Sequence, residues 1–339
     1  MTTFAKLAIP NIVTNMIGFL SDIVIIRFAG HSEDATNVAV VGLAGTCCRI
    51  LVSSILVGLN AAQETLTSQA FGADNLRLCG IYLNRGSAIL TVIFIPLALT
   101  TSILGEQIFV AIGQDPQVSQ HAASMVRIYL VTVFLWGQYD LRKRWLACQR
   151  ITLVPMVASF VGTILLIPNC YLFMYTCDLG INGLVLAAVS KDFTVLFITV
   201  IYCYCKPEIR AVIQPHSCET LRGWSQYLMV SLPATVMVCA EWWAFEFLTV
   251  MAGILGVMEL SSQTIAFMVI IFLFMIPLGI QEATCGLIGN CIGANNVPLA
   301  KSFFSMTMKV ALSVILLTAI TTIFARNQIA GFFTDDLAL

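Results

Sequence analysis

Long apolar runs, separated by short polar segments, make up most of this chain. A transmembrane helix needs about 20 mostly apolar residues, because the hydrocarbon core of a bilayer is roughly 30 Å thick. Runs of this length favour helices, whose backbone hydrogen bonds are all internal. We therefore expect an all-α protein, a polytopic transmembrane helix bundle. Its spans are predicted at residues 6–29, 37–63, 84–106, 122–141, 153–176, 182–204, 225–253, 261–289 and 304–325.

A segment of the first half of the chain returns 221 positions later in the second half. Gly58, Ala62, Leu66, Gly72, Ala73 and Asn75 reappear in the same order as Gly279, Ala283, Leu287, Gly293, Ala294 and Asn296. Internal duplication of this kind is typical of secondary transporters. Because an even number of spans separates the copies, both enter the membrane in the same direction. We expect two parallel six-helix repeats with the second incomplete.

The offset also predicts the domain organisation. Residues 1–204 are expected to form an N-lobe of six helices, residues 205–224 a cytoplasmic linker, and residues 225–339 a partial C-lobe of three helices. The chain stops where the second copy should begin its fourth helix. We expect the coding sequence to continue for about 90 residues, which is room for three further helices and their loops.

Composition and charge further limit the classes of protein to which this chain can belong. The chain is 59% hydrophobic and 10% charged, whereas about a quarter of an ordinary soluble domain is charged. A net charge of −1 provides no basic face for nucleic acid. No CxxC pair occurs and the three histidines lie far apart, so the spacing of a metal site is absent. No Gly-x-Ser-Gly or Gly-x-Gly-Asp pattern marks an intramembrane hydrolase, and we do not expect an enzyme.

Basic residues are distributed unevenly between the predicted loops. The loops after even-numbered spans carry 11 of the 17 lysines and arginines, whereas the odd loops carry three. The eleven are Arg77, Arg85, Arg142, Lys143, Arg144, Arg150, Lys206, Arg210, Arg222, Lys301 and Lys309. Within or at the edge of the spans we expect only Arg49 and Lys191 among the cationic residues.

Several motifs carry a family resemblance over essentially the whole chain. They are Phe28-Ala-Gly-His31, Gly58-Leu-Asn-Ala-Ala-Gln-Glu-Thr-Leu66, Ser68-Gln-Ala-Phe-Gly-Ala73, Leu146-Ala-Cys-Gln149, Glu241-Trp-Trp-Ala-Phe-Glu246 and Met275-Ile-Pro-Leu-Gly279. In these motifs the chain resembles the multidrug and toxic compound extrusion (MATE) transporters of the eukaryotic type, truncated after about nine of twelve helices. The resemblance implies two six-helix bundles around a central cavity. It also implies export of organic, often cationic, compounds in exchange for H⁺ or Na⁺.

The same resemblance implies the partners and the location of the protein. The coupling ion is expected to be H⁺ rather than Na⁺, with no other cofactor. The partners are expected to be a small organic substrate and membrane lipids, with no nucleic acid, and the chain is expected to be a monomer. Its location would be the plasma membrane or an internal, vacuolar or vesicular, membrane.

Glu241 is the first candidate for the transport site. It lies about halfway along the 225–253 span, where an ionisable residue is costly and points to function. A carboxyl group in a medium of low dielectric constant binds a proton readily and can release it when a cation arrives. Trp242, Trp243 and Phe245 offer aromatic faces that attract organic cations. The alternative is that Glu241 is hydrogen-bonded to a neighbouring helix and that the tryptophans face lipid.

Other acids complete the candidate set for substrate or cation binding. Glu246 follows Glu241 by about 140° around a helix, so we expect the two acids to face different directions, with Glu246 bracing helices or lying nearer the outer mouth. Glu64, with Gln69 nearby, matches a family motif position, but we favour its pairing within its own lobe, because polar groups commonly join membrane helices. Glu282 is expected either in the polar cavity or near the membrane surface. Asp22 lies one helical turn before the position of a family aspartate, here Ile25, and with Asn15 and Ser21 is a substitute cation ligand.

Two alternative functions remain open. A lipid-linked sugar flippase of the same broader superfamily would need more cationic residues inside its helices to bind phosphate, and the presence of only Arg49 and Lys191 there favours export of cations. The other alternative is a truncated, inactive transporter fragment.

The distribution of basic residues predicts the orientation of the chain. Positively charged loops remain in the cytoplasm, so the even loops and the N-terminus should lie inside and Leu339 outside. Glycosylation tags or cysteine labelling in sealed cells would measure this. Labelling of the 142–150 loop from outside would invert the assignment.

Overall fold

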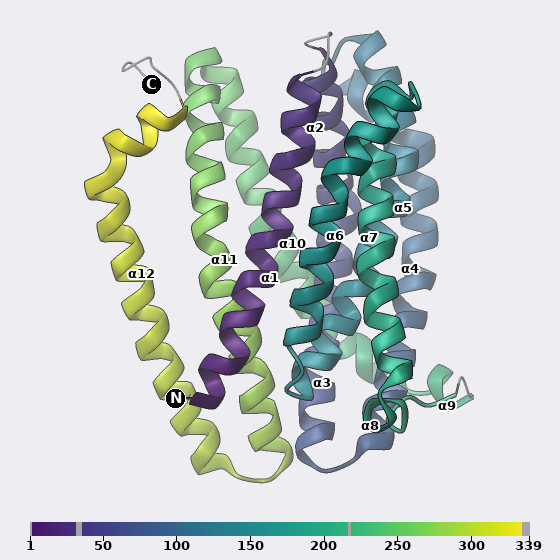
Figure 1. Cartoon of the computed structure of the whole chain (residues 1–339), viewed down its shortest axis with the longest axis vertical. Helices are drawn as coiled ribbons and strands as arrows, with labels where there is room; N and C mark the ends of the chain where they lie inside the picture. Colours follow the sequence, from purple (N-terminus) through teal and green to yellow (C-terminus); the bar gives the residue numbers. More distant parts are fainter. Residues whose placement is uncertain (1, 32–35, 216–217, 334–339) are drawn as a thin grey trace.

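The chain forms a bundle of long helices, and the computed structural model describes residues 2–31, 36–215 and 218–333 (Figure 1). Within these ranges, nine helical stretches are long and apolar enough to cross a membrane, and they coincide with the nine predicted spans. The first repeat contains α1 (Thr2–Gly30), α2 (Thr36–Cys48), η1 (Arg49–Ser53), α3 (Ser54–Gly72), α4 (Leu76–Ala111), α5 (Pro116–Cys148), α6 (Leu153–Tyr171), η2 (Leu172–Thr176) and α7 (Gly180–Cys205). Short α8 (Pro207–Arg210) and α9 (Cys218–Leu221) lead to α10 (Trp224–Leu255), α11 (Val257–Gly293) and α12 (Val297–Phe333) of the second repeat.

Helix α5 is longer than its predicted span of 122–141, and this corrects the assignment of three basic residues. It begins after Asp115, whose Oδ1 accepts a hydrogen bond from the backbone N–H of Gln117 at 2.8 Å, with Pro116 in the first turn. It ends near Arg150, which has a φ of 65°. Arg142, Lys143 and Arg144 therefore belong to the helix, and the prediction that they form a cytoplasmic loop was wrong.

The duplication is visible in the geometry of two turns. Asp74 and Asn295, which are 221 positions apart, both adopt left-handed backbone conformations with φ of 57° and 55°. The next residue in each copy caps the following helix: Asn75 accepts from Leu78 and Asn296 accepts from Leu299, both at 3.1 Å. The predicted pair of parallel repeats is confirmed in this local detail.

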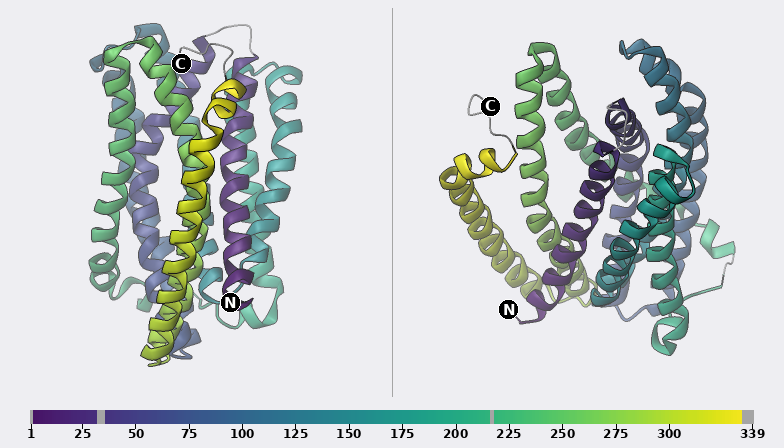
Figure 2. Two further views of the ribbon diagram at one scale, coloured as in Figure 1. Left: turned by 90° about the vertical axis from the view of Figure 1, so that its left-hand side faces the viewer. Right: turned by 45° about the horizontal axis from the view of Figure 1, so that its top comes forward.

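The two repeats meet through equivalent glycines at the ends of α3 and α11. A Cβ atom on Gly72 would lie 2.0 Å from the carbonyl oxygen of Asn290, and one on Gly293 would lie 2.0 Å from that of Gln69. Only glycine permits so close an approach of two backbones. This contact lies at the end of the bundle that also carries the N-terminus, here called the N-terminal end. From it the second-repeat helices and α4 to α7 spread apart toward the other end (Figures 1 and 2).

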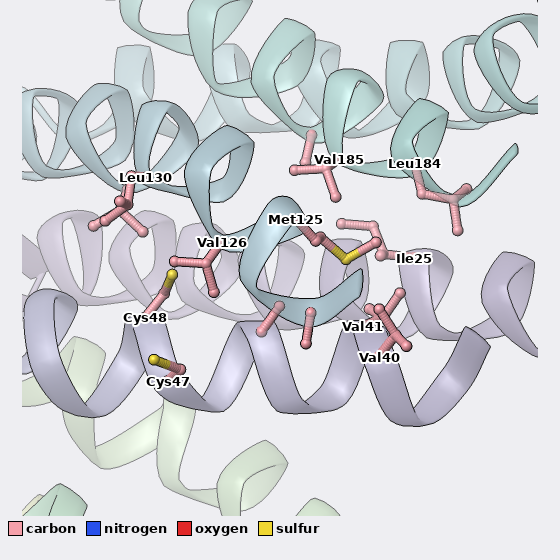
Figure 3. Close-up of a cluster of buried hydrophobic side chains, with 14 of the residues drawn as sticks. Ile25, Val40, Val41, Cys47, Cys48, Met125, Val126, Leu130, Leu184 and Val185 are labelled. Carbon is pink, nitrogen blue, oxygen red and sulfur yellow. The ribbon is translucent and has the colours of Figure 1, made fainter. Parts of the chain in front are cut away.

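The main apolar core lies inside the first repeat. Side chains of α1, α2, α5 and α7 interlock there, with Ile25, Val40, Met125 and Leu184 among them (Figure 3). The apolar side chains of α12, in contrast, are mostly exposed, as expected of a helix surface that faces lipid or further helices. The linker packs at the N-terminal end, where Asn84 donates to the carbonyl oxygen of Gln214 at 2.7 Å.

The glycine contact generates a prediction about stability. Gly293→Ala should lower the thermal unfolding midpoint, because its methyl group would overlap the Gln69 carbonyl. Gly18→Ala is the matched control, since a Cβ there meets nothing within 4 Å and alanine favours a helix. Thermal unfolding in detergent measures both variants, and an unchanged midpoint in Gly293→Ala would contradict the contact.

Candidate functional site

Helix α10 presents its two acids in different directions. Cys239 and Trp243 face the first repeat, because the Cys239 thiol donates to Ser54 Oγ at 3.5 Å and the Trp243 indole donates to the carbonyl oxygen of Ile50 at 3.1 Å. Glu241 follows Cys239 by two residues, about 200° around the helix. Its side chain is exposed and lies on the face of α10 turned away from α3.

Glu246 lies on the side of α10 that contacts η1. Its Oε1 is 3.6 Å from Nε of Arg49, and Arg49 also donates to Thr46 Oγ1 at 2.8 Å. Glu246 therefore braces α10 against the first repeat, in line with the expected separation of the two acids. Trp242 is half-buried, and Phe245 packs against Phe267 of α11 with ring centroids 5.5 Å apart.

Asp22 of α1 is exposed and lies near cationic side chains of the first repeat. Lys191 and Arg49 both lie within electrostatic range of its carboxyl group, and Lys191 Nζ is 3.0 Å from Oδ1 of buried Asp192. The neighbouring Ser21 hydroxyl lies 2.8 Å from Thr163 Oγ1. Asn15, which is near Asp22 in the sequence, contacts Lys143. Asp192 was not among the residues predicted for this group.

The most extensive polar feature is a buried cluster between α3, α5 and α11. We call Glu64, Asp140, Lys143, Arg144 and Glu282 the charge cluster. Its members form a row of alternating sign. Arg144 lies between two acids, with Nη1 3.0 Å from Glu64 Oε2 and Nε 2.8 Å from Asp140 Oδ2.

Lys143 extends the row to the second repeat. Its Nζ is 2.8 Å from Glu282 Oε1 and 3.7 Å from Asp140 Oδ1, and it donates to Asn15 Oδ1 at 3.0 Å. Glu282 is 4% exposed, so it is buried between the two repeats. Glu64 is paired within its own repeat, and Gln69 is half-buried near the close contact with Gly293.

Asp140, Lys143 and Arg144 were not predicted as site residues. The signal was present, since Asp140 precedes Lys143 by three positions and Arg144 by four, the spacing at which helical side chains meet. It was obscured because the predicted span ended at residue 141. Among the described residues, no group of three or more His, Cys, Asp or Glu side chains has the arrangement of a metal site.

The duplicated bundle, with its long apolar helices and buried ion pairs, defines a multi-pass membrane protein built from two repeats. The chain belongs to the MatE family, whose model matches residues 10–172 and 233–339 on either side of the linker.

The chain is similar to vertebrate members of this family. It is 29% identical over 333 residues to multidrug and toxin extrusion protein 1 of Oryctolagus cuniculus, a match that covers 97% of this chain and 58% of that protein. It is 30% identical over 335 residues to the protein of the same name from Danio rerio, covering 98% and 56%. The chain thus spans a little over half the length of these relatives. Both are extrusion proteins by name and not enzymes.

Solved structures share the fold. The eukaryotic MATE transporter AtDTX14 superposes with a TM-score of 0.91 at 23% identity, over 99% of this chain and 75% of that one. A MOP superfamily transporter from Pyrococcus furiosus superposes with a TM-score of 0.84 at 19% identity, over 99% and 74%. The resemblance stated from the motifs is therefore confirmed at the level of family and fold.

The charge cluster generates a prediction about stability. Arg144→Met should lower the free energy of unfolding by about 3 to 5 kcal/mol, because it leaves two buried carboxylates without their shared cation. Arg77→Met is the matched control, since it breaks the exposed 2.8 Å pair with Glu219 and should cost about 0 to 1 kcal/mol. Equal free energies of unfolding for the two variants would show that the Arg144 ion pairs stabilise the fold no more than a surface pair does.

Proposed function

We propose that this chain is a secondary active antiporter that exports organic, often cationic, compounds in exchange for H⁺, or less favourably Na⁺. It would work as a monomer, by alternating access between its two repeats. The observation that carries the proposal is that Glu241, unlike other acids in the helices, has no cationic partner among the described residues. Five other acids inside the helices, Glu64, Asp140, Asp192, Glu246 and Glu282, form ion pairs, and Asp22 lies within electrostatic range of Lys191 and Arg49. Among the described residues, no ion pair is formed by Glu241.

An unpaired carboxylate in the middle of an apolar helix needs another source of positive charge. A proton or a bound cation can supply it, and binding of one removes the attraction for the other. Such mutually exclusive binding at one group is what an antiporter requires. Trp242 precedes the Phe245–Phe267 pair by one turn of α10, so the site offers aromatic surface beside the acid, which favours organic cations.

The flippase remains the second candidate because the helices contain more cationic residues than were expected from the sequence. Arg142, Lys143 and Arg144 join Arg49 and Lys191 inside the helices. For the Pyrococcus furiosus transporter, a binding pocket of reversed polarity has been taken to suggest a different function. Four of these five cationic side chains, however, are paired with carboxylates and Arg142 donates to Gln138, which lowers their attraction for a phosphate and favours export of cations.

Replacement of Glu241 by glutamine tests the antiport. Glutamine keeps the shape and hydrogen bonding of the side chain but cannot titrate. In vesicles with an imposed proton gradient, we expect Glu241→Gln to reduce transport of a fluorescent organic cation at least tenfold, with unchanged protein abundance. Glu106→Gln, an exposed acid-to-amide change in α4, should transport at the parental rate.

The other outcomes are decisive as well. Parental transport in Glu241→Gln would assign Glu241 a structural role and make Glu246 or Asp22 the next candidate. Movement of a fluorescent anionic phospholipid across the vesicle membrane, without transport of the cation, would favour the flippase. Replacing the proton gradient by a sodium gradient separates the two coupling ions.

A further inference from the structure

The charge cluster crosses the boundary between the two repeats. Lys143 of α5 and Glu282 of α11 make its direct link, with Asn15 of α1 donating to the same Glu282 oxygen at 3.5 Å. The side chains of the cluster are between 4% and 10% exposed. Glu64 and Glu282 lie on α3 and α11, the helices that approach through Gly72 and Gly293, and the other three members lie on α5. Contact between the repeats at the N-terminal end therefore brings Glu282 to Lys143 and completes the cluster.

The charges of the cluster do not balance. Glu64, Asp140 and Glu282 contribute three negative charges when ionised, whereas Lys143 and Arg144 contribute two positive charges. One buried carboxylate is thus in excess, and an uncompensated charge away from water is strongly unfavourable. Glu64 displays this imbalance directly, because its Oε2 accepts from Arg144 whereas its buried Oε1 has no hydrogen-bond partner among the described residues.

Neighbouring groups on the surrounding helices do not supply the missing positive charge. The other titratable side chains near the cluster are thiols and phenols on α4, α5, α10 and α11. These groups are neutral near pH 7. Arg85 of α4 turns toward the linker, where its Nη2 donates to the carbonyl oxygen of Glu219 at 3.2 Å. The titratable neutral groups are Cys79, Tyr139, Cys148, Tyr227 and Cys285.

We propose that the charge cluster is a proton-binding site that controls contact between the repeats. When the repeats are closed at the N-terminal end, one proton is held on one of the two terminal carboxyl groups, Glu64 or Glu282, and the cluster is neutral. When the repeats separate, water enters, the O–H bond of the protonated carboxyl group breaks, and the proton passes to water. The motion itself rests on the alternating access of the proposed function, but the proton site is separate from Glu241.

The sign of the pH dependence follows from this linkage. Because the closed form binds one proton more than the open form, a fall in pH favours closure, by up to tenfold in the ratio of closed to open molecules per pH unit. Opening would release the proton on the side of the membrane that the basic loops predict to be cytoplasmic.

Distances between the repeats at different pH values test the proposal. Leu76 and Val297 are exposed, equivalent first positions of helices at the N-terminal end. A keto-bearing amino acid at each position would carry a spin label without involving the native cysteines. Pulsed electron resonance in lipid nanodiscs, between pH 5.5 and 8.5, then reports the closed fraction. In the parental chain we expect this fraction to fall as pH rises.

Three variants decide the interpretation. Glu282→Gln and Glu64→Gln each leave two acids and two bases, so each should remain closed at every pH. Glu106→Gln, outside the cluster, should keep the parental pH dependence. A parental distance distribution that does not respond to pH would overturn the proposal. So would a retained response in both cluster variants, or a chain that is open at every pH in both.

The measurement is independent of transport. It needs no substrate, so pH-dependent distances together with failure of cation transport would reject the antiport and leave the proton site in place. Transport at the parental rate, with distances that do not change with pH, would reject the proton site and leave the antiport in place.

Discussion

The need to pair charge inside an apolar bundle determines how the polar residues of this protein are arranged. An ionised side chain in the low-dielectric interior is tolerated when a partner of opposite sign lies beside it. The pairs Glu246–Arg49, Asp192–Lys191 and Glu282–Lys143 all follow this rule. Two of them join the second repeat to the first, so charge pairing also determines which helices are held together. Glu241 forms no such pair with the described residues, whereas Asp22, which also lacks an ion pair, has Lys191 and Arg49 within electrostatic range.

Much of the fold could be predicted from the sequence because its determinants are local. Runs of about 20 apolar residues specify helices in lipid without reference to other parts of the chain. The duplication was equally accessible, since Gly72 and Gly293, and the capping residues Asn75 and Asn296, occupy equivalent positions in both copies. Helix ends were less predictable. Three basic residues ended the apolar run at residue 141, although the helix continues to Cys148.

The candidate site was predicted as a set of residue types and not as a set of contacts. The division of roles between Glu241 and Glu246 follows from the helical period alone. The partners of Glu64 and Glu282 do not, because Arg144 and Lys143 are 80 and 139 positions away, respectively. Nothing in a single sequence reports which helices become neighbours. Because Lys143 and Arg144 were assigned to a loop, there was no reason to consider them as partners of buried acids.

The reciprocal approach of Gly72 to Asn290 and of Gly293 to Gln69 has the form of an isologous interface, in which each half presents the same patch to the other. This is the geometry of a symmetric homodimer, here contained within one polypeptide. A first repeat produced alone would expose its half of the interface. Ser68 of that patch lies against its counterpart Gly289, where a Cβ would meet the serine hydroxyl, so the two halves of the interface have diverged to fit each other and not their own copies.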